Sequence, residues 1–109
     1  MSVNYGAKYG FGFVITEKDI RELTPEKQDK IIDSIFFHEI DGWRDDENTP
    51  YFFGIILNSL EPGEFSLVPV YDVFKPGELN QMTTEFKTYT DLFYKYHHGP
   101  RHYIFCSII

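Results

Sequence analysis

A chain of 109 residues, of which 42% are hydrophobic, is long enough to form one domain around a single core, and we expect residues 1–109 to do so. Charged residues make up 25% of the chain, which excludes a membrane-spanning composition. The first residues lack the apolar stretch of a secretory signal, so the expected compartment is the cytoplasm. The formal net charge of −7 argues against direct binding of nucleic acid, which requires many Lys and Arg residues.

The first predicted element is a strand over residues 9–15, where Tyr9, Phe11, Phe13 and Ile15 alternate with small residues. This alternation places aromatic rings on one face of the strand and glycines on the other. The glycine face is expected to admit the close approach of a helix or of another backbone.

Two helix starts follow this strand. Thr16, with an acid three residues later, has the pattern of a capping box for a short helical turn. Thr24 followed by Pro25 is a second start. The apolar residues that then recur at helical spacing are Ile31, Ile32, Ile35 and Phe36, while Lys27, Asp29, Lys30 and Asp33 are expected to face water. This pattern predicts a helix that ends near Gly42.

Two further strands are predicted at residues 51–60 and 65–74, joined by a turn at Pro62 and Gly63. We expect them to pair as an antiparallel hairpin. Pro69 cannot donate a hydrogen bond to a neighbouring strand, so the second of these strands is expected at a sheet edge or with a bulge.

The last two predicted elements are a helix and a strand. Apolar residues spaced three and four apart predict a long helix that begins near Pro76 and ends before Gly99. Its apolar seam consists of Leu79, Met82, Phe86, Tyr89, Phe93 and Tyr96. Residues 101–109 stay apolar to the end and predict a final strand.

The order strand, helix, strand, strand, helix, strand predicts an α+β fold, namely a ferredoxin-like βαββαβ sandwich. Its four-stranded, mainly antiparallel sheet would carry two helices on one face, with the other face open. Pro69 leaves the strand order uncertain, because the third strand of this arrangement is central.

The excess of negative charge lies in the middle third of the chain, between residues 39 and 72. This asymmetry indicates a protein partner with a basic surface. The residues predicted to contact that partner are Asp41, Trp43, Arg44, Asp45, Asp46, Glu47 and Asp72. A Trp and an Arg among carboxylates are typical of an interface hot spot. The alternatives are a solvated acidic loop and a tryptophan that folds back over the core.

The string Gly10-Phe11-Gly12-Phe13-Val14 resembles the motif with which RNA-recognition and cold-shock domains stack bases on aromatic rings. The resemblance implies RNA binding through this strand. It covers only these five residues, because the motif of RNA-recognition domains begins with Lys or Arg and ends with an aromatic residue, where this chain has Tyr9 and Thr16. In RNA-recognition domains the string also lies on the third strand, whereas here it lies on the first.

No catalytic motif is present, so we expect no enzymatic activity and no cofactor. Three histidines, His97, His98 and His102, could together hold zinc or copper if a turn brought them close. The structural alternative is that they favour the C-terminal end of the preceding helix, as His38 would at the end of the first helix. Cys106 lies on an apolar strand and is interpreted as a small core residue.

Together these features predict a small acidic protein-binding domain. Its character is typical of inhibitors encoded by phages and mobile elements, which block the basic, nucleic-acid-binding surface of a partner protein. The alternative is a regulatory domain that binds a small molecule or a nucleotide. We also expect a homodimer, because the last strand is apolar on both faces and lies at a sheet edge in the predicted fold. The residues expected on the open sheet face or in this dimer are Tyr9, Phe11, Phe13, Tyr103 and Phe105.

Overall fold

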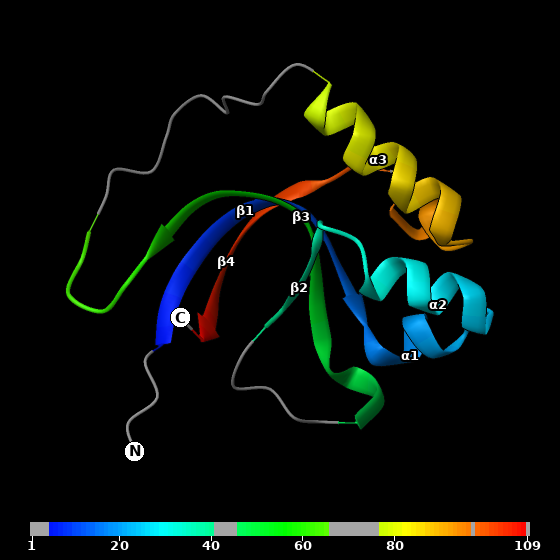
Figure 1. The fold of residues 1–109 in the computed structure, drawn as a ribbon, viewed down its shortest axis with the longest axis horizontal. Helices are drawn as coiled ribbons and strands as arrows, with labels where there is room; N and C mark the ends of the chain where they lie inside the picture. The colour runs from blue at the N-terminus through cyan, green and yellow to red at the C-terminus, as the bar shows by residue number, and fades with distance from the viewer. Residues whose placement is uncertain (1–4, 41–45, 66–76, 97, 109) are drawn as a thin grey trace.

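The computed structural model describes residues 5–40, 46–65, 77–96 and 98–108, which form an α+β fold (Figure 1). In chain order the elements are β1 (Tyr5–Thr16), α1 (Glu17–Arg21), α2 (Pro25–Ile32), β2 (Phe37–Glu39), the 3-10 helix η1 (Asp46–Asn48), β3 (Pro50–Leu60), α3 (Glu78–Tyr89), the 3-10 helix η2 (Phe93–Tyr96) and β4 (Arg101–Ile108). None of the described helices is long and apolar enough to cross a membrane.

The strands form one antiparallel sheet in the order β2-β3-β1-β4. The long strands β1 and β3 are central, and Phe13 of β1 lies opposite Phe53 of β3. On its other side β1 pairs with β4, where Phe11 lies opposite His102. A register shift between Tyr9 and Gly10 marks a bulge in β1. Among the described strands the final one therefore lies at a sheet edge, as predicted.

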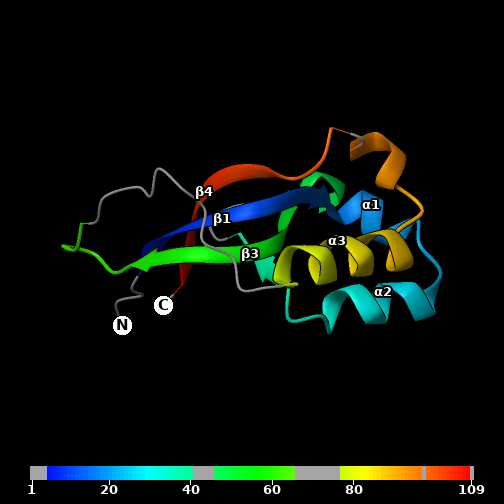
Figure 2. The same ribbon diagram turned by 90° about the horizontal axis from the view of Figure 1, so that it is seen from above.

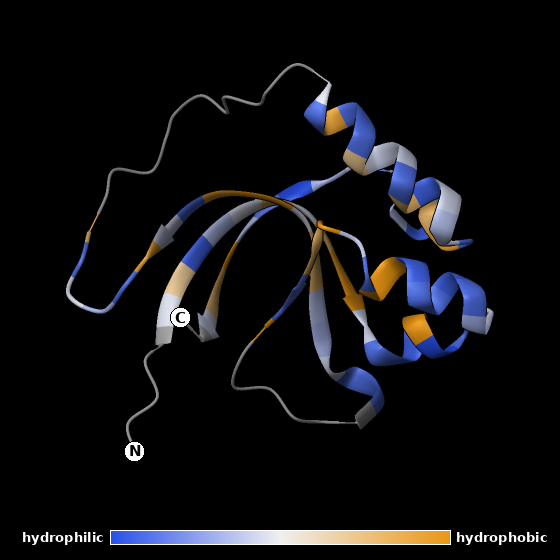
Figure 3. Ribbon diagram, in the orientation of Figure 1, coloured by the Kyte–Doolittle hydropathy of each residue, from blue (hydrophilic) through white to orange (hydrophobic). Residues whose placement is uncertain are grey.

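The main core lies between one face of the sheet and the helices. Phe13 and Phe53 point to this face and pack against Met82 and Phe86 of α3, all at most 2% exposed. Figure 2 shows α1, α2 and α3 together at one end of the sheet. In Figure 3 the arch of β3 and the end of β1 next to α1 are coloured as hydrophobic. The prediction that the aromatic rings of β1 point to an open face is therefore wrong for Phe13, because its ring stacks on Phe86.

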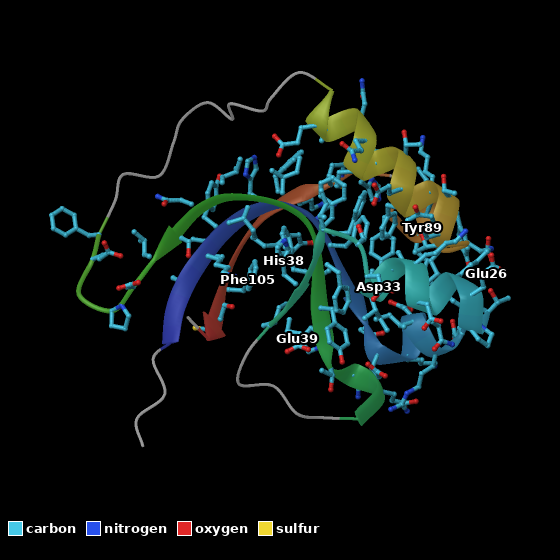
Figure 4. The ribbon with its side chains drawn as sticks, in the orientation of Figure 1. Glu26, Asp33, His38, Glu39, Tyr89 and Phe105 are labelled. Atoms are coloured by element: carbon cyan, nitrogen blue, oxygen red, sulfur yellow. The ribbon has the colours of Figure 1, made fainter. Side chains whose placement is uncertain are left out.

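The opposite face of the sheet carries a second, smaller aromatic cluster. Phe52 is fully buried there, with its ring centroid 4.9 Å from that of Phe105. A Cβ atom added to Gly10 would lie 2.7 Å from the Phe52 ring, and one added to Gly54 would lie 2.6 Å from it. Beside Gly10 the glycine face thus admits an aromatic ring, whereas at Gly12 it admits the backbone of β3, as predicted, because an added Cβ would lie 2.5 Å from Cα of Gly54. The ring of His38 also lies near Phe52, with centroids 6.0 Å apart, and Figure 4 labels both His38 and Phe105.

The first long helix is shorter than predicted. It ends at Ile32 with Asp33 as its C-cap, whereas the prediction extended it toward Gly42. The chain turns at Ser34, whose hydroxyl accepts a hydrogen bond from the backbone N–H of Phe36 at 3.2 Å. Phe36 is then buried against Phe53, and the chain continues as β2. His38 consequently lies on a strand and not at a helix end.

The structure describes only part of the predicted hairpin of residues 51–60 and 65–74. Residues 66–74 of the predicted strand 65–74, including Pro69, lie outside the described residues. Phe65 is 95% exposed and belongs to no strand. In the described sheet the neighbours of β3 are β1 and β2.

The long C-terminal helix is also shorter than predicted. It runs as α3 to Tyr89 and is followed by η2, because Thr90 has an extended backbone. All six predicted seam residues nevertheless belong to the core or pack against it.

Candidate functional site

Helices α2 and α3 lie side by side and run antiparallel. Lys27 near the start of α2 forms an ion pair with Asp91 just after α3, with Nζ and Oδ2 2.7 Å apart. Beyond the other end of α2, the hydroxyl of Ser34 donates a hydrogen bond to Oε2 of Glu85 at 2.8 Å. These two contacts join the start of α2 to the end of α3 and the end of α2 to an earlier part of α3, as expected for antiparallel helices. They bring polar side chains of both helices into one row.

An open groove with a volume of about 420 Å³ lies between these helices. Its lining residues are Asp29, Lys30, Asp33, Ser34, Ile35, Gln81, Glu85 and Tyr89. Figure 4 shows that Asp33 and Tyr89 come from the two opposite helices. Carboxylates outnumber cations in this lining, so the groove favours a positively charged ligand.

The basic residues near the groove are already paired. Lys30 lies 3.6 Å from a carboxylate oxygen of Glu26, and its Nζ stands 5.8 Å from the centre of the Tyr89 ring. Within the described part of the chain, Asp29 and Asp33 enter no ion pair. The negative charge of these two exposed side chains is therefore available to a partner.

Apolar side chains lie beside these carboxylates. Ile35 is 75% exposed and Ile32 is 48% exposed, although both were predicted on the apolar side of the first helix. Ile31 and Phe36 are the residues of that pattern that enter the core. Of the two exposed isoleucines, Ile35 lines the groove and gives it an apolar margin beside its charged residues, which is a combination found in protein interfaces.

A separate polar network connects α1 to η2 through the buried Asp19. Its Oδ1 accepts a hydrogen bond from Nζ of Lys95 at 3.1 Å, and its Oδ2 accepts one from the Tyr96 hydroxyl at 3.2 Å. The backbone N–H of Thr16 donates to the same carboxylate, which completes the predicted capping box. Burial alone raises the pKa of Asp19, but the hydrogen bonds from Thr16 and Lys95 outweigh burial and leave this pKa below the ordinary value of an aspartate.

This network makes stability depend on pH in the acid range. A carboxyl whose pKa is lower in the folded state stabilises the fold above its unfolded pKa of about 3.9, and this contribution is lost as the pH falls through the folded pKa. We expect Asp19→Asn to flatten the acid fall in the free energy of unfolding, measured by urea denaturation at a series of pH values. The control Asp91→Asn removes only an exposed ion pair and should leave that fall unchanged. Equal acid dependence of wild type and Asp19→Asn would contradict this assignment.

Five of the seven residues predicted to contact the partner fall in the ranges 41–45 and 66–76. Asp41, Trp43, Arg44, Asp45 and Asp72 lie outside the described residues. Asp46 begins η1, and Glu47 within it is exposed. The structure therefore leaves the predicted acidic loop as a prediction.

The predicted aromatic contact residues divide between the two faces of the sheet. Tyr9 and Phe11 are half-buried and contact His102, whose Nδ1 lies 2.6 Å from the Tyr9 hydroxyl. Tyr103 and Phe105 lie on the opposite face with Phe52. Phe105 is 8% exposed, so its ring is part of a core and not of an open face.

The predicted histidine cluster and the cysteine also have defined positions. His97 lies outside the described residues, and no three His, Cys, Asp or Glu side chains within the described ranges gather at metal-binding spacing. The interpretation of Cys106 as a core residue is wrong, because its side chain is exposed. It lies opposite Ala7, near the start of β1, where the helices do not cover the sheet. The prediction that a second copy of the chain covers β4 stays a prediction.

Sequence reasoning missed the groove. It interpreted Asp29 and Asp33 as a solvated helix face, and it gave Glu85 no role. The hydrophobic pattern showed which sides of the two helices face the sheet, but no local signal indicates which helices lie next to each other.

No protein-family model matches the chain, no curated protein sequence matches it, and no solved structure matches it.

Proposed function

We propose that this chain acts by binding another protein, and that the groove between α2 and α3 receives a basic segment of that partner with an apolar residue beside the positive charge. The observation that carries the proposal is that two carboxylates, Asp29 and Asp33, and the exposed side chain of Ile35 line the same groove. Opposite charge would steer the partner to this surface, and the isoleucine would supply apolar contact.

The rigidity of the groove supports this proposal. Ser34 and Gln81 both donate hydrogen bonds to Glu85, at 2.8 Å and 3.4 Å. The carboxylate of Glu85 is thereby held in place before any partner arrives. A preorganised carboxylate loses less conformational entropy on binding than a mobile one.

The charge of the chain supports a particular class of partner. We propose a protein whose basic surface otherwise contacts nucleic acid, so that occupancy of this surface inhibits nucleic-acid binding. The net charge of −7 makes the chain itself a poor ligand for the polyanionic backbone of nucleic acid. Phe13, which the resemblance to RNA-recognition domains would use for base stacking, is 2% exposed and is not accessible to a base.

We also propose that the fold is the ferredoxin-like βαββαβ sandwich. In support of this, the third strand in chain order is central, the fourth lies at an edge, and all neighbours are antiparallel. The second strand of this arrangement is then Phe37–Glu39 and the third is Pro50–Leu60.

A random peptide display library tests the groove without knowledge of the natural partner. We expect peptides selected on the wild-type chain to carry Lys or Arg next to an apolar residue. Asp33→Lys should weaken their binding by about tenfold, because it replaces an attraction with a repulsion. Asp33 is the C-cap of α2, and a lysine there interacts favourably with the negative end of the helix dipole. The variant should therefore remain folded.

Glu61→Lys is the matched control. It makes the same change in net charge at the turn beyond β3, where Glu61 is exposed. Selected peptides should keep their affinity for this variant. Equal loss in the two variants would show that bulk charge alone attracts the peptides, and would refute the groove as the contact surface.

A further inference from the structure

A second pocket lies at the edge of the sheet, at the point where β4 begins. The pairing of β4 with β1 begins at Arg101 and Gly12, so residues of β1 beyond Gly12 have no β4 partner. A pocket of about 240 Å³ lies beside this step, and among the residues that precede β4 its lining includes Lys95, Tyr96, His98 and Gly99.

The lining of this pocket has a charge opposite to that of the whole chain. Lys95, His98 and Arg101 contribute to it, together with the rings of Tyr96 and Tyr103. The chain has a net charge of −7, so a pocket with three basic side chains is not explained by its composition. Basic side chains that converge on one small space are a means of binding an anion.

The carboxylate that accepts a hydrogen bond from Lys95 does not oppose an anion in this pocket. Asp19 lies behind Lys95 and is 8% exposed. Its carboxylate already accepts hydrogen bonds from Lys95 and from the hydroxyl of Tyr96. These donors offset its charge and fix the positions of both side chains at the pocket wall.

Arg101 is the residue on which anion binding would depend most. It is exposed at the first position of β4, and within the described ranges it forms no ion pair. Its guanidinium can donate two parallel hydrogen bonds to one anionic group. Tyr103, two residues later on the same face of β4, provides an aromatic surface beside that group.

We propose that this pocket binds a small phosphomonoester, with the phosphate at Arg101 and His98 and an apolar or aromatic group against Tyr103. Phosphate offers three oxygens to donors from several directions, which suits a pocket with basic side chains on more than one side. The site lies apart from the groove between α2 and α3 and shares none of its lining residues. Its ligand would therefore bind independently of a protein partner.

Phenyl phosphate is the probe for this site, with phenol as the probe that lacks the phosphate. We expect saturable binding of phenyl phosphate by calorimetry and no binding of phenol at the same concentration. In amide NMR spectra, phenyl phosphate should shift the signals of Gly12, Gly99 and Arg101. Arg101→Gln should weaken binding by about 10- to 100-fold, since it removes hydrogen bonds from a charged donor.

Arg21→Gln is the matched control, because Arg21 is an exposed arginine that does not line the pocket. It should leave the affinity for phenyl phosphate unchanged. Absence of saturable binding to the wild-type chain would overturn the proposal, as would an equal loss in the two arginine variants. Peptide selection tests the groove between α2 and α3, and phenyl phosphate tests this pocket. Failure of one proposal therefore does not imply failure of the other.

Discussion

Replacing Phe86 by alanine should destabilise the chain by about 3–5 kcal/mol, because it empties the centre of the main core. Phe86 is fully buried, and its ring stacks on that of Phe13 with centroids 4.1 Å apart. Phe53 and Tyr96 also contact this ring, each with centroids 5.5 Å away. One side chain thus joins α3 to both central strands and to η2.

The loss is large against the whole stability of a domain of this size, which is about 5–15 kcal/mol. Urea denaturation of Phe86→Ala should show a much lower midpoint with an unchanged slope. Phe65→Ala is the control, because Phe65 is 95% exposed and should change stability by less than about 0.5 kcal/mol. Similar midpoints for the two variants would contradict the assignment of Phe86 to the core.

Replacing Gly54 by alanine should destabilise the chain by about 1–3 kcal/mol or more, although it adds only one methyl group. The added Cβ would lie 2.5 Å from the carbonyl oxygen of Phe11 and 2.8 Å from Cα of Gly12. Both atoms belong to the backbone of the neighbouring strand β1, so they can move only if the strands separate. The ring of Phe52 closes the remaining space at 2.6 Å.

Gly63→Ala separates this steric effect from the backbone effect of losing a glycine. Gly63 has a φ of 87° and open space around its Cα, so alanine there meets only the left-handed backbone cost of about 1–2 kcal/mol. Relief of the Gly54→Ala defect by a second change, Phe52→Leu, would show that the ring contributes to the clash. A Gly54→Ala variant as stable as the wild type would contradict the close packing of β1 on β3.

The local signals in the sequence predicted the helix starts correctly. The hydroxyl of Thr16 accepts a hydrogen bond from the N–H of Asp19, and the hydroxyl of Thr24 accepts one from the N–H of Lys27. Each of these contacts spans only three residues. A side chain that acts so close to its own position can be interpreted without knowledge of the rest of the fold.

It was harder to predict which residues point to which face of the sheet. Such a prediction depends on apolar and polar residues alternating along a strand, and a strand that is buried on both faces does not show this alternation. Phe52 and Phe53 are adjacent and both fully buried, one in each core. The short strand β2 has only three residues, too few to show a period. It follows Phe36 so closely that the helical pattern appeared to continue through it.

The groove depends on the contact between α2 and α3, which are separated by β2 and β3 in the chain. The contact between Ser34 and Glu85 spans 51 residues. Nothing in the neighbourhood of either residue indicates the other. The composition shows that the chain is acidic. It does not show where carboxylates lie beside an exposed apolar side chain, because that depends on the tertiary fold.

Amide chemical-shift mapping tests the central claim most directly, with the peptide most enriched on the wild-type chain as the probe. We expect the largest shifts at Asp29, Asp33, Ser34 and Glu85, which line the groove between α2 and α3. The signals of the turn at Gly63 should remain unchanged. Shifts confined to that turn or to the pocket at Arg101, with none in the groove, would contradict the account.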